Sequence, residues 1–377
     1  MTILRDAVRV CFFIQRLEVG FGVAVAVAET ARRLVERGVE VVVYTTSQKG
    51  IDLPGVEVRT LAIPGGNTNR LLPLYQRRTD RLLRGMAGEL GEFDWVVLAS
   101  FPFYSLAPIL YEERVGGRPR TLWWEFGLPP SAGFSLGGKA NWWWLRRALA
   151  GQVLAVDRVV TISRFLRGTL PEKARWGALE IYLGGDHLPI SSNGELPEQV
   201  RELGEDAFVC LSVARLSPHH HPYKGLGELV GAYRQVRKTH PRTRLVLAGR
   251  VESQEELRGW SEGAVVVANP TPAELAALYR RADLYVTMSR WEGFNLPILE
   301  AGYQETPALA YEIGAHRENV TRFLVEPEEH LMVERWRELA DLGEVLREEG
   351  RRVRERALAF TWSQTAKGIL RLLQEEG

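Results

Sequence analysis

The stretch Ser289-Arg-Trp-Glu-Gly-Phe-Asn-Leu-Pro-Ile-Leu-Glu-Ala301 comes directly after an apolar run, residues 282–288, that is typical of a buried strand. Pro297 suits the first turn of a helix, because the backbone N–H that proline lacks would have no partner there. The pattern therefore predicts a strand, a loop and the start of a helix. The free N–H groups and partial positive charge of a helix start favour anions and hydroxyl groups as ligands.

Two carboxylates, Glu292 and Glu300, lie in this stretch. We expect Glu300 in the first turn of the helix, where it could accept hydrogen bonds from a diol such as ribose. Glu292, on the loop, could meet a second polyol. The alternative is that both acids only stabilise the helix start electrostatically, and their spacing does not decide between the two interpretations.

Strand-like apolar runs alternate with longer amphipathic stretches from Val8 to about Asp186, and again from Phe208 to about Val325. This alternation predicts two Rossmann-like α/β domains, each with a parallel sheet. The segment Leu188–Pro197 is rich in residues that break regular structure, so we place the domain boundary there, between residues 190 and 191. Ligands of such sheets bind beyond the carboxyl ends of the strands, which predicts a site in a cleft between the domains.

The composition is that of a globular protein of about two domains, with 377 residues, 45% hydrophobic and 25% charged. A net charge of +1 gives no overall attraction to nucleic acid, which we do not expect as a partner. Cys11 and Cys210 lie within apolar runs and are expected to be buried, reduced thiols. No apolar run is long enough to cross a membrane, and the first residues do not resemble a signal peptide, so we expect a cytoplasmic protein.

Two cations follow the first strand of the second domain. Arg215 comes just after the run 208–214, and Lys224 precedes Gly225. An arginine fork and a lysine point charge together suit a diphosphate, although solvated loop charges are the alternative. The intervening histidines, residues 219–221, cannot all face one metal ion comfortably, so we expect a solvated loop and no metal site.

The first turn between strand and helix contains Gly20 and Gly22, which let the backbone approach a ligand closely. A close-packed turn is the alternative. Val25 occupies the third glycine position of a dinucleotide-binding fingerprint, which argues against a Rossmann oxidoreductase.

The stretch from Ser289 to Ala301 resembles the paired-glutamate signature of retaining glycosyltransferases of family 4, and Arg215 with Lys224 resembles that family's phosphate clamp. The resemblance implies the GT-B fold, an α/β architecture of two Rossmann-like domains facing a central cleft. It also implies that a C-terminal helix, about residues 360–377, crosses back to the N-terminal domain. Residues 1–190 would then bind the acceptor and residues 191–359 the nucleotide-sugar donor.

The reaction that the resemblance implies is metal-independent transfer of a hexosyl group, with retention, from a UDP- or GDP-linked sugar to a glycan, a lipid-linked acceptor or a small molecule. No cofactor is expected. Arg215 and Lys224 would stabilise the phosphates, Glu300 would hold the ribose, and Glu292 would orient the transferred sugar. The other expected donor-binding residues are Gly20, Gly22, Phe294, Asn295, Leu296, Arg250, Ala268 and Glu318.

Three departures from the family pattern matter. Glu125 follows a predicted strand where family members often have a catalytic-site histidine, so it is either a polar contact to donor sugar or acceptor, or an ordinary loop acid. Asn295 stands where glycine is commoner, and the loop before Lys224 is long. These leave open a catalytically degenerate protein that only binds nucleotide sugars, or a GT-B sugar-nucleotide epimerase. A glycoside phosphorylase is disfavoured because no lysine suggests itself for pyridoxal phosphate.

Tryptophan and arginine gather at Trp142–Trp144 with Arg146 and Arg147, and arginines recur among leucines over residues 77–84. Such stretches occur at membrane interfaces, which would imply a lipid or lipid-linked acceptor and a peripheral position on the inner face of the membrane. The interpretation that we favour is a core helix with a solvated basic face.

Overall fold

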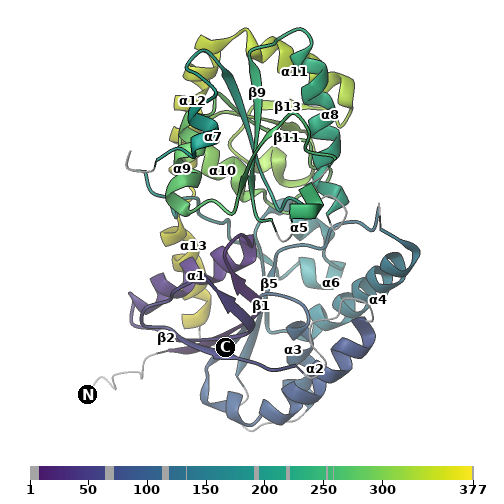
Figure 1. Cartoon of the computed structure of the whole chain (residues 1–377). Coiled ribbons are helices and arrows are strands. Elements are labelled where there is room, and N and C mark those ends of the chain that lie inside the picture. The colour runs from purple at the N-terminus through teal and green to yellow at the C-terminus, as the bar shows by residue number, and fades with distance from the viewer. Residues whose placement is uncertain are drawn as a thin grey trace. The chain divides into compact units, whose positions relative to one another are not determined.

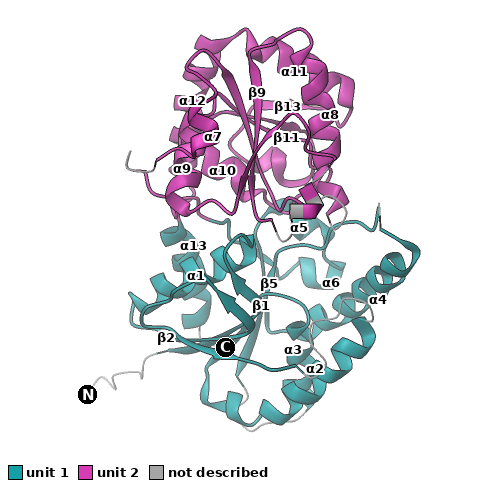
Figure 2. Cartoon of the chain, viewed as in Figure 1, with its two compact units in different colours: residues 1–183, 362–377 teal, residues 184–361 magenta. Residues whose placement is uncertain are grey.

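The structure is a computed structural model that describes residues 8–63, 72–112, 119–132, 134–190, 195–217, 221–251, 254–257 and 259–375. The chain divides into two compact units, residues 1–183 with 362–377 and residues 184–361 (Figure 2). Each unit is an α/β structure with its own parallel sheet.

Unit 1 has a seven-stranded parallel sheet, among the residues described, in the order β3-β2-β1-β4-β5-β6-β7. Its strands are β1 Arg9–Glu18, β2 Glu40–Lys49, β3 Glu57–Thr60, β4 Trp95–Leu98, β5 Arg120–Glu125, β6 Arg158–Thr161 and β7 Leu179–Glu180. Its helices are α1 Gly22–Val35, α2 Leu72–Met86, α3 Leu106–Glu112, α4 Leu136–Gln152, α5 Arg164–Thr169, α6 Glu172–Arg175 and α13 Trp362–Gln374, with short 3-10 turns η1 Glu89–Glu92, η2 Phe103–Ser105 and η3 Val153–Ala155 (Figure 1).

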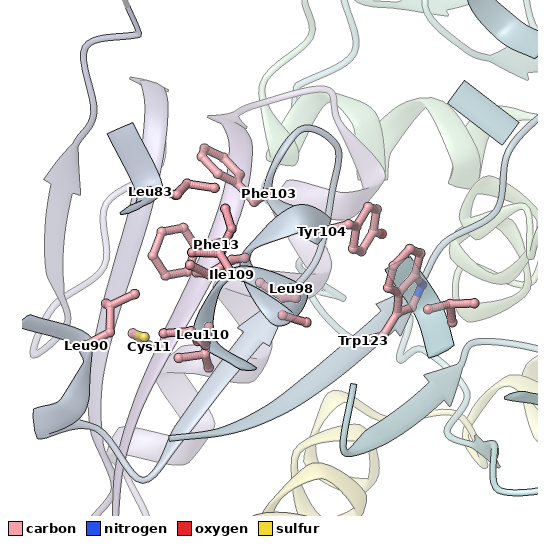
Figure 3. Close-up of a cluster of buried hydrophobic side chains, with 14 of the residues drawn as sticks. Cys11, Phe13, Leu83, Leu90, Leu98, Phe103, Tyr104, Ile109, Leu110 and Trp123 are labelled. Atoms are coloured by element: carbon pink, nitrogen blue, oxygen red, sulfur yellow. The ribbon is translucent and has the colours of Figure 1, made fainter. Parts of the chain in front are cut away.

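The core of unit 1 explains the unbroken apolar run within β1. Residues 10–14 are all buried, since helices cover both faces of a parallel sheet. Phe13 stacks on Tyr44 of the neighbouring strand, with ring centroids 4.6 Å apart. Cys11 is buried in the same cluster as Phe13 (Figure 3). Cys11 and Cys210 are both buried free thiols, as predicted.

Unit 2 has a six-stranded parallel sheet, over its described residues, in the order β10-β9-β8-β11-β12-β13. Its strands are β8 Phe208–Val213, β9 Thr243–Gly249, β10 Val265–Ala268, β11 Leu284–Thr287, β12 Ala308–Tyr311 and β13 Phe323–Val325. Its helices are α7 Glu198–Arg201, α8 Leu226–Arg237, α9 Pro272–Arg281, α10 Leu296–Tyr303, α11 Glu329–Ala340 and α12 Gly343–Ala357, with η4 Pro222–Lys224, η5 Gln254–Leu257 and η6 Gly314–Glu318. The predicted pair of Rossmann-like sheets is confirmed.

The C-terminal helix α13 returns to unit 1, as predicted. It packs against α1, the indole Nε1 of Trp95 donates to the carbonyl of Leu373 at 3.0 Å, and Thr365 donates to the carbonyl of Tyr182 at 2.7 Å. Trp362 and Ile369 are fully buried in this contact face. The last helix therefore completes the core of the N-terminal unit.

The units divide after Leu183, which is earlier than the predicted boundary at residue 190. Gly185 explains the difference, because its N–H donates to the carbonyl of Phe360 at 2.9 Å and a Cβ there would lie 2.7 Å from Leu299. The segment after Leu183 thus already packs on unit 2. Residues 191–194 of the predicted linker lie outside the described residues.

The two basic stretches differ in how they are buried. Helix α2 buries Tyr75 and Leu83 and exposes Arg77, Arg81 and Arg84, so it is a core helix with a basic face, as favoured. Helix α4, which carries Trp142–Trp144, has no fully buried residue, so it is more exposed than predicted, although Leu149 packs against the core of unit 1.

Candidate functional site

The predicted donor-binding residues of unit 2 share one edge of the sheet. Arg250 follows β9, Arg215 follows β8, Ala268 ends β10, and the loop with Glu292 follows β11. Glu318 closes the turn η6 after β12. Because these strands are parallel neighbours, their carboxyl ends place all five residues along the same edge.

Gly225 lets the loop that carries Lys224 lie directly against the end of β11. Its φ of +63° is left-handed, and a Cβ there would come within 2.3 Å of the carbonyl oxygen of Met288. The backbone N–H of Arg290 also donates to the carbonyl of Tyr223 at 2.8 Å. The glycine after Lys224 is therefore required by close backbone approach.

Lys224 and Glu292 form a largely buried ion pair, with Nζ and Oε1 2.7 Å apart and side-chain exposures of 21% and 8%. Burial lowers the pKa of Lys224, but the charge and hydrogen bond of Glu292, together with the charge of Tyr223, raise it, so that the pKa is raised overall. The nearby positive charge of Arg215 lowers the pKa of Lys224. The structure thus gathers Arg215, Lys224 and Glu292 into one charged cluster.

Glu300 is held by two donors from other parts of unit 2. The hydroxyl of Tyr279 donates to its Oε2 at 2.7 Å, and Nε2 of His187 lies 3.2 Å from its Oε1. The fifth residue of α10 is Glu300, so the first turn holds no acid, contrary to our expectation. The interpretation that Glu300 only stabilises the helix start is therefore not supported.

Asn295 has the left-handed conformation that glycine often provides, with φ of +65°, and asparagine tolerates it better than most residues. Its Nδ2 lies 2.7 Å from Nε2 of His316, whose Nδ1 lies 2.7 Å from the carbonyl oxygen of Tyr311. A carbonyl only accepts, so Nδ1 carries the proton and Nε2 accepts from the Asn295 amide. Burial lowers the pKa of His316, which keeps this ring neutral.

The loop before α10 is fixed through its backbone. Asn319 donates through Nδ2 to the carbonyl oxygens of Phe294 at 2.9 Å and Asn295 at 3.2 Å. The side chains of Phe294 and Leu296 are buried. A ligand at this loop would therefore meet main-chain groups of these two residues more readily than their side chains.

The loops around Arg250 are joined to the one that carries Arg215. The N–H of Leu216 donates to the carbonyl of Arg250 at 2.9 Å, and Gly249 has a φ of +140° that places its Cα against the carbonyl of Ala214. Ala268 is exposed and Arg250 half-buried. These residues form the far end of the same edge.

Two family models match the chain, and together they cover most of it. The model described as Glycosyltransferase Family 4 matches residues 21–176, and the one described as Glycosyl transferases group 1 matches residues 207–341. The chain belongs to glycosyltransferase family 4. The predicted family and its GT-B fold are confirmed.

Relatives of this family 4 chain include a D-inositol 3-phosphate glycosyltransferase from Segniliparus rotundus, 31% identical over 58% of the chain and 53% of that protein. A glycogen synthase from Mycobacterium tuberculosis is 29% identical over 47% of the chain and 44% of its own length. The chain thus matches about half the length of these relatives. A sucrose-phosphate synthase structure from Thermosynechococcus elongatus shares the fold, with a TM-score of 0.77 at 18% identity over 97% of the chain and 98% of that structure.

Glu125 ends β5 in unit 1. Its Oε2 accepts from Trp123 Nε1 at 2.7 Å and its Oε1 accepts from the N–H of Gly127 at 2.6 Å. Burial raises the pKa of the Glu125 carboxyl, and the two hydrogen bonds act against that rise. Both oxygens are thus already engaged within the strand and loop that carry them.

The glycine turn of this family 4 chain follows β1, again at a carboxyl strand end. Gly20 has a φ of +86°, which explains the glycine there. Gly22 begins α1, and a Cβ on it would meet nothing within 4 Å. Packing therefore does not require Gly22, which leaves close approach of a ligand as the reason we propose for it.

Sequence reasoning gave no role to three residues of the candidate site, namely His187, Tyr279 and His316, because each reaches its partner only through folding. His219 and His220 lie outside the described residues. In the part of the chain that the structure describes, no three His, Cys, Asp or Glu side chains cluster as a metal site would need. The described helices also include none that is both apolar and long enough to span a bilayer.

Proposed function

We propose that the chain transfers a hexosyl group, with retention and without a metal ion, from a UDP- or GDP-linked sugar to a glycan, a lipid-linked acceptor or a small molecule. The observation that carries this proposal is the charged cluster of Arg215, Lys224 and Glu292 on the same sheet edge as Glu300. Such an edge is where doubly wound sheets bind their ligands.

The two cations would stabilise the departing nucleoside diphosphate. Lys224 has three N–H donors, and Glu292 takes one of them, so the others remain available for phosphate oxygens. Arg215 would supply a planar fork for the same group. Charge that develops on a leaving group in a water-poor site is stabilised most by such fixed cations.

Glu292 would orient the transferred sugar. Its carboxylate is fixed by Lys224, and the carbonyl of Glu292 accepts from the N–H of Ala315 at 3.3 Å, so both side chain and backbone are held. Its second oxygen can accept from a sugar hydroxyl. The contribution we propose is positioning and electrostatic stabilisation of an oxocarbenium-like centre.

Glu300 would bind the ribose of the donor. A carboxylate offers about four lone-pair positions, and Tyr279 and His187 occupy two of them. The remaining positions suit the paired hydroxyls of a ribose. Holding Glu300 in place before the ligand arrives lowers the entropy lost on binding.

The acceptor is proposed more broadly. One relative is named a D-inositol 3-phosphate glycosyltransferase and another a glycogen synthase, which supports a hydroxyl-bearing small molecule or a glycan. Glu125 and the turn with Gly20 and Gly22 are the residues of unit 1 that we propose for contacts to sugar or acceptor.

The test is a panel of UDP-, GDP- and ADP-sugars, read by thermal stabilisation and by slow hydrolysis of the donor. We expect one nucleotide to raise the melting temperature and its sugar conjugate to be hydrolysed to the retained anomer, as followed by NMR. The proposal would be refuted if no donor in the panel stabilised the chain and none was turned over. An inverted product would refute retention alone.

A binding protein without transferase activity is the second candidate, and Glu125 is the observation that favours it. Its carboxylate is held by Trp123 and Gly127 within its own strand and loop, and it stands where the family resemblance implies histidine, a side chain that can donate a hydrogen bond as well as accept one. In that case a nucleotide sugar would stabilise the chain with no hydrolysis. A Glu125→His variant that gains turnover would support this second candidate.

A further inference from the structure

Helix α4 differs from the other described α-helices because none of its residues is fully buried, although it is seventeen residues long. A surface helix of a globular unit normally buries one apolar face. Here Leu136 is 87% exposed and Trp143 is 64% exposed. The helix nevertheless has a defined start, since the hydroxyl of Ser135 accepts from the N–H of Gly138 at 3.3 Å. One side of the helix packs on unit 1, where Leu149 lies against the core cluster, while Leu136 and Trp143 remain on the exposed side.

The three tryptophans of α4 are not equivalent. Trp142 is tied to unit 1, because its Nε1 donates to the carbonyl of Pro129 at 2.5 Å and the Arg146 guanidinium lies 5.3 Å from its ring centre. Trp143 is mostly exposed, and Trp144 is half-buried. One tryptophan thus fixes the helix while another is presented to the surroundings.

The charge of this surface is predominantly positive. Helix α4 contains Lys139, Arg146 and Arg147 and no acidic residue. Helix α2, which contacts α4, carries four arginines and one aspartate over its length (Figure 1). The chain as a whole has a net charge of only +1, so this excess of positive charge is local. A partner with negative charge spread over a surface would match it.

A hollow of about 550 Å³ lies between α3 and α4. Two indoles, one guanidinium and four other side chains line it. The lining residues are Pro108, Trp143, Trp144, Arg147, Ala148, Gly151 and Gln152. Indoles prefer the boundary between hydrocarbon and water, and arginine binds phosphate through paired N–H groups. Both preferences are met by a phospholipid headgroup with the start of its acyl chains.

We propose that α4, with the neighbouring basic helix α2, docks on a membrane surface rich in anionic lipids, with Trp143 entering the interface and Arg146 and Arg147 binding lipid phosphates. A helix that combines exposed tryptophan and leucine with basic residues alone has the composition of an interfacial helix. This membrane contact stands without the proposed function. Membrane contact would also favour a lipid or lipid-linked acceptor among the acceptors proposed. That second inference, unlike the membrane contact itself, rests on the proposed transferase function.

The test is cosedimentation of the purified chain with vesicles of phosphatidylcholine alone, or of phosphatidylcholine mixed with phosphatidylglycerol, without any nucleotide sugar. We expect binding to the anionic vesicles that weakens at high salt. Because each basic residue near such a surface strengthens partitioning by about fivefold, Arg146→Gln with Arg147→Gln should weaken binding by roughly thirtyfold. Trp143→Ser should weaken it as well.

Trp176→Ser is the matched control, since Trp176 is 79% exposed in the same unit and lies outside α4. The control should bind vesicles like the unaltered chain, and unchanged melting temperatures would show that all variants fold. The proposal is overturned if neither kind of vesicle binds the chain, or if Trp176→Ser weakens binding as much as Trp143→Ser. Dimerisation that Trp143→Ser abolishes, without vesicle binding, would also overturn it and assign the surface to a second copy of the chain. None of these outcomes bears on donor hydrolysis, so the failure of this proposal and that of the transferase proposal are distinguishable.

Discussion

Replacing Lys224 with methionine tests whether the Lys224–Glu292 pair is as important to unit 2 as its burial indicates. The substitution keeps much of the side-chain volume and leaves Glu292, whose side chain is only 8% exposed, without its cation. Removing one partner of a buried ion pair typically costs about 3–5 kcal/mol. The Lys224 side chain is 21% exposed, so partial solvation reduces our expectation to about 2 kcal/mol in the free energy of unfolding.

The assay is thermal unfolding at neutral pH, where a loss of this size lowers the melting temperature of unit 2 by roughly 4–8 °C. Adding Glu292→Gln should recover part of the loss, because no charge is then left unpaired. Arg352→Met is the control, since it breaks an exposed pair with Glu348, which should cost about 0.5 kcal/mol or less. A Lys224→Met variant no less stable than this control would refute the reasoning.

Three further perturbations probe other parts of the site. Gly225→Ala should lower the free energy of unfolding by at least about 2 kcal/mol, because it places a Cβ on left-handed backbone and against the main chain of Met288, whereas Gly227→Ala within α8 should be neutral or stabilising. Equal effects of the two substitutions in urea unfolding would contradict this. The pKa of His316 is lowered in the folded state, so the unfolded chain binds more protons and the free energy of unfolding should fall as the pH drops below about 6.5. His316→Gln should make that fall smaller, and an unchanged pH profile of stability would count against a neutral His316 ring. Tyr279→Phe removes a hydrogen bond to a carboxylate and should weaken nucleotide binding by about tenfold, measured by calorimetry, with unaltered affinity speaking against its role in holding Glu300.

The apolar runs predicted the sheets well because parallel strands are buried on both faces. Residues 10–14 and residues 284–288 are continuous in the sequence and buried in the structure. The strand, loop and helix predicted around Pro297 are present as β11 and α10. Local pattern was sufficient here, since side-chain burial and backbone hydrogen bonding favour the same conformation.

The partners of the candidate site could not be predicted in the same way. His187, Tyr279 and His316 are separated along the chain from the carboxylates and the amide that they contact, and no local pattern marks them. The Lys224–Glu292 contact was also unforeseen, although both residues were named, because it depends on the close approach that Gly225 permits. Helix α4 is more exposed than predicted because only one side of it, with Leu149, packs on unit 1, and local pattern does not mark Trp143 as exposed.

The most direct test of the nucleotide site is a calorimetric titration of the unaltered chain and of Glu300→Ala with UDP and GDP. Glu262→Ala is the matched control, since the Glu262 side chain is 84% exposed and belongs to the same unit. We predict that one nucleotide binds, that Glu300→Ala weakens its binding by at least about tenfold through lost hydrogen bonds to the ribose, and that Glu262→Ala does not. Equal affinities in a Glu300→Ala variant that is folded, as judged by its melting transition, would contradict the proposed donor site.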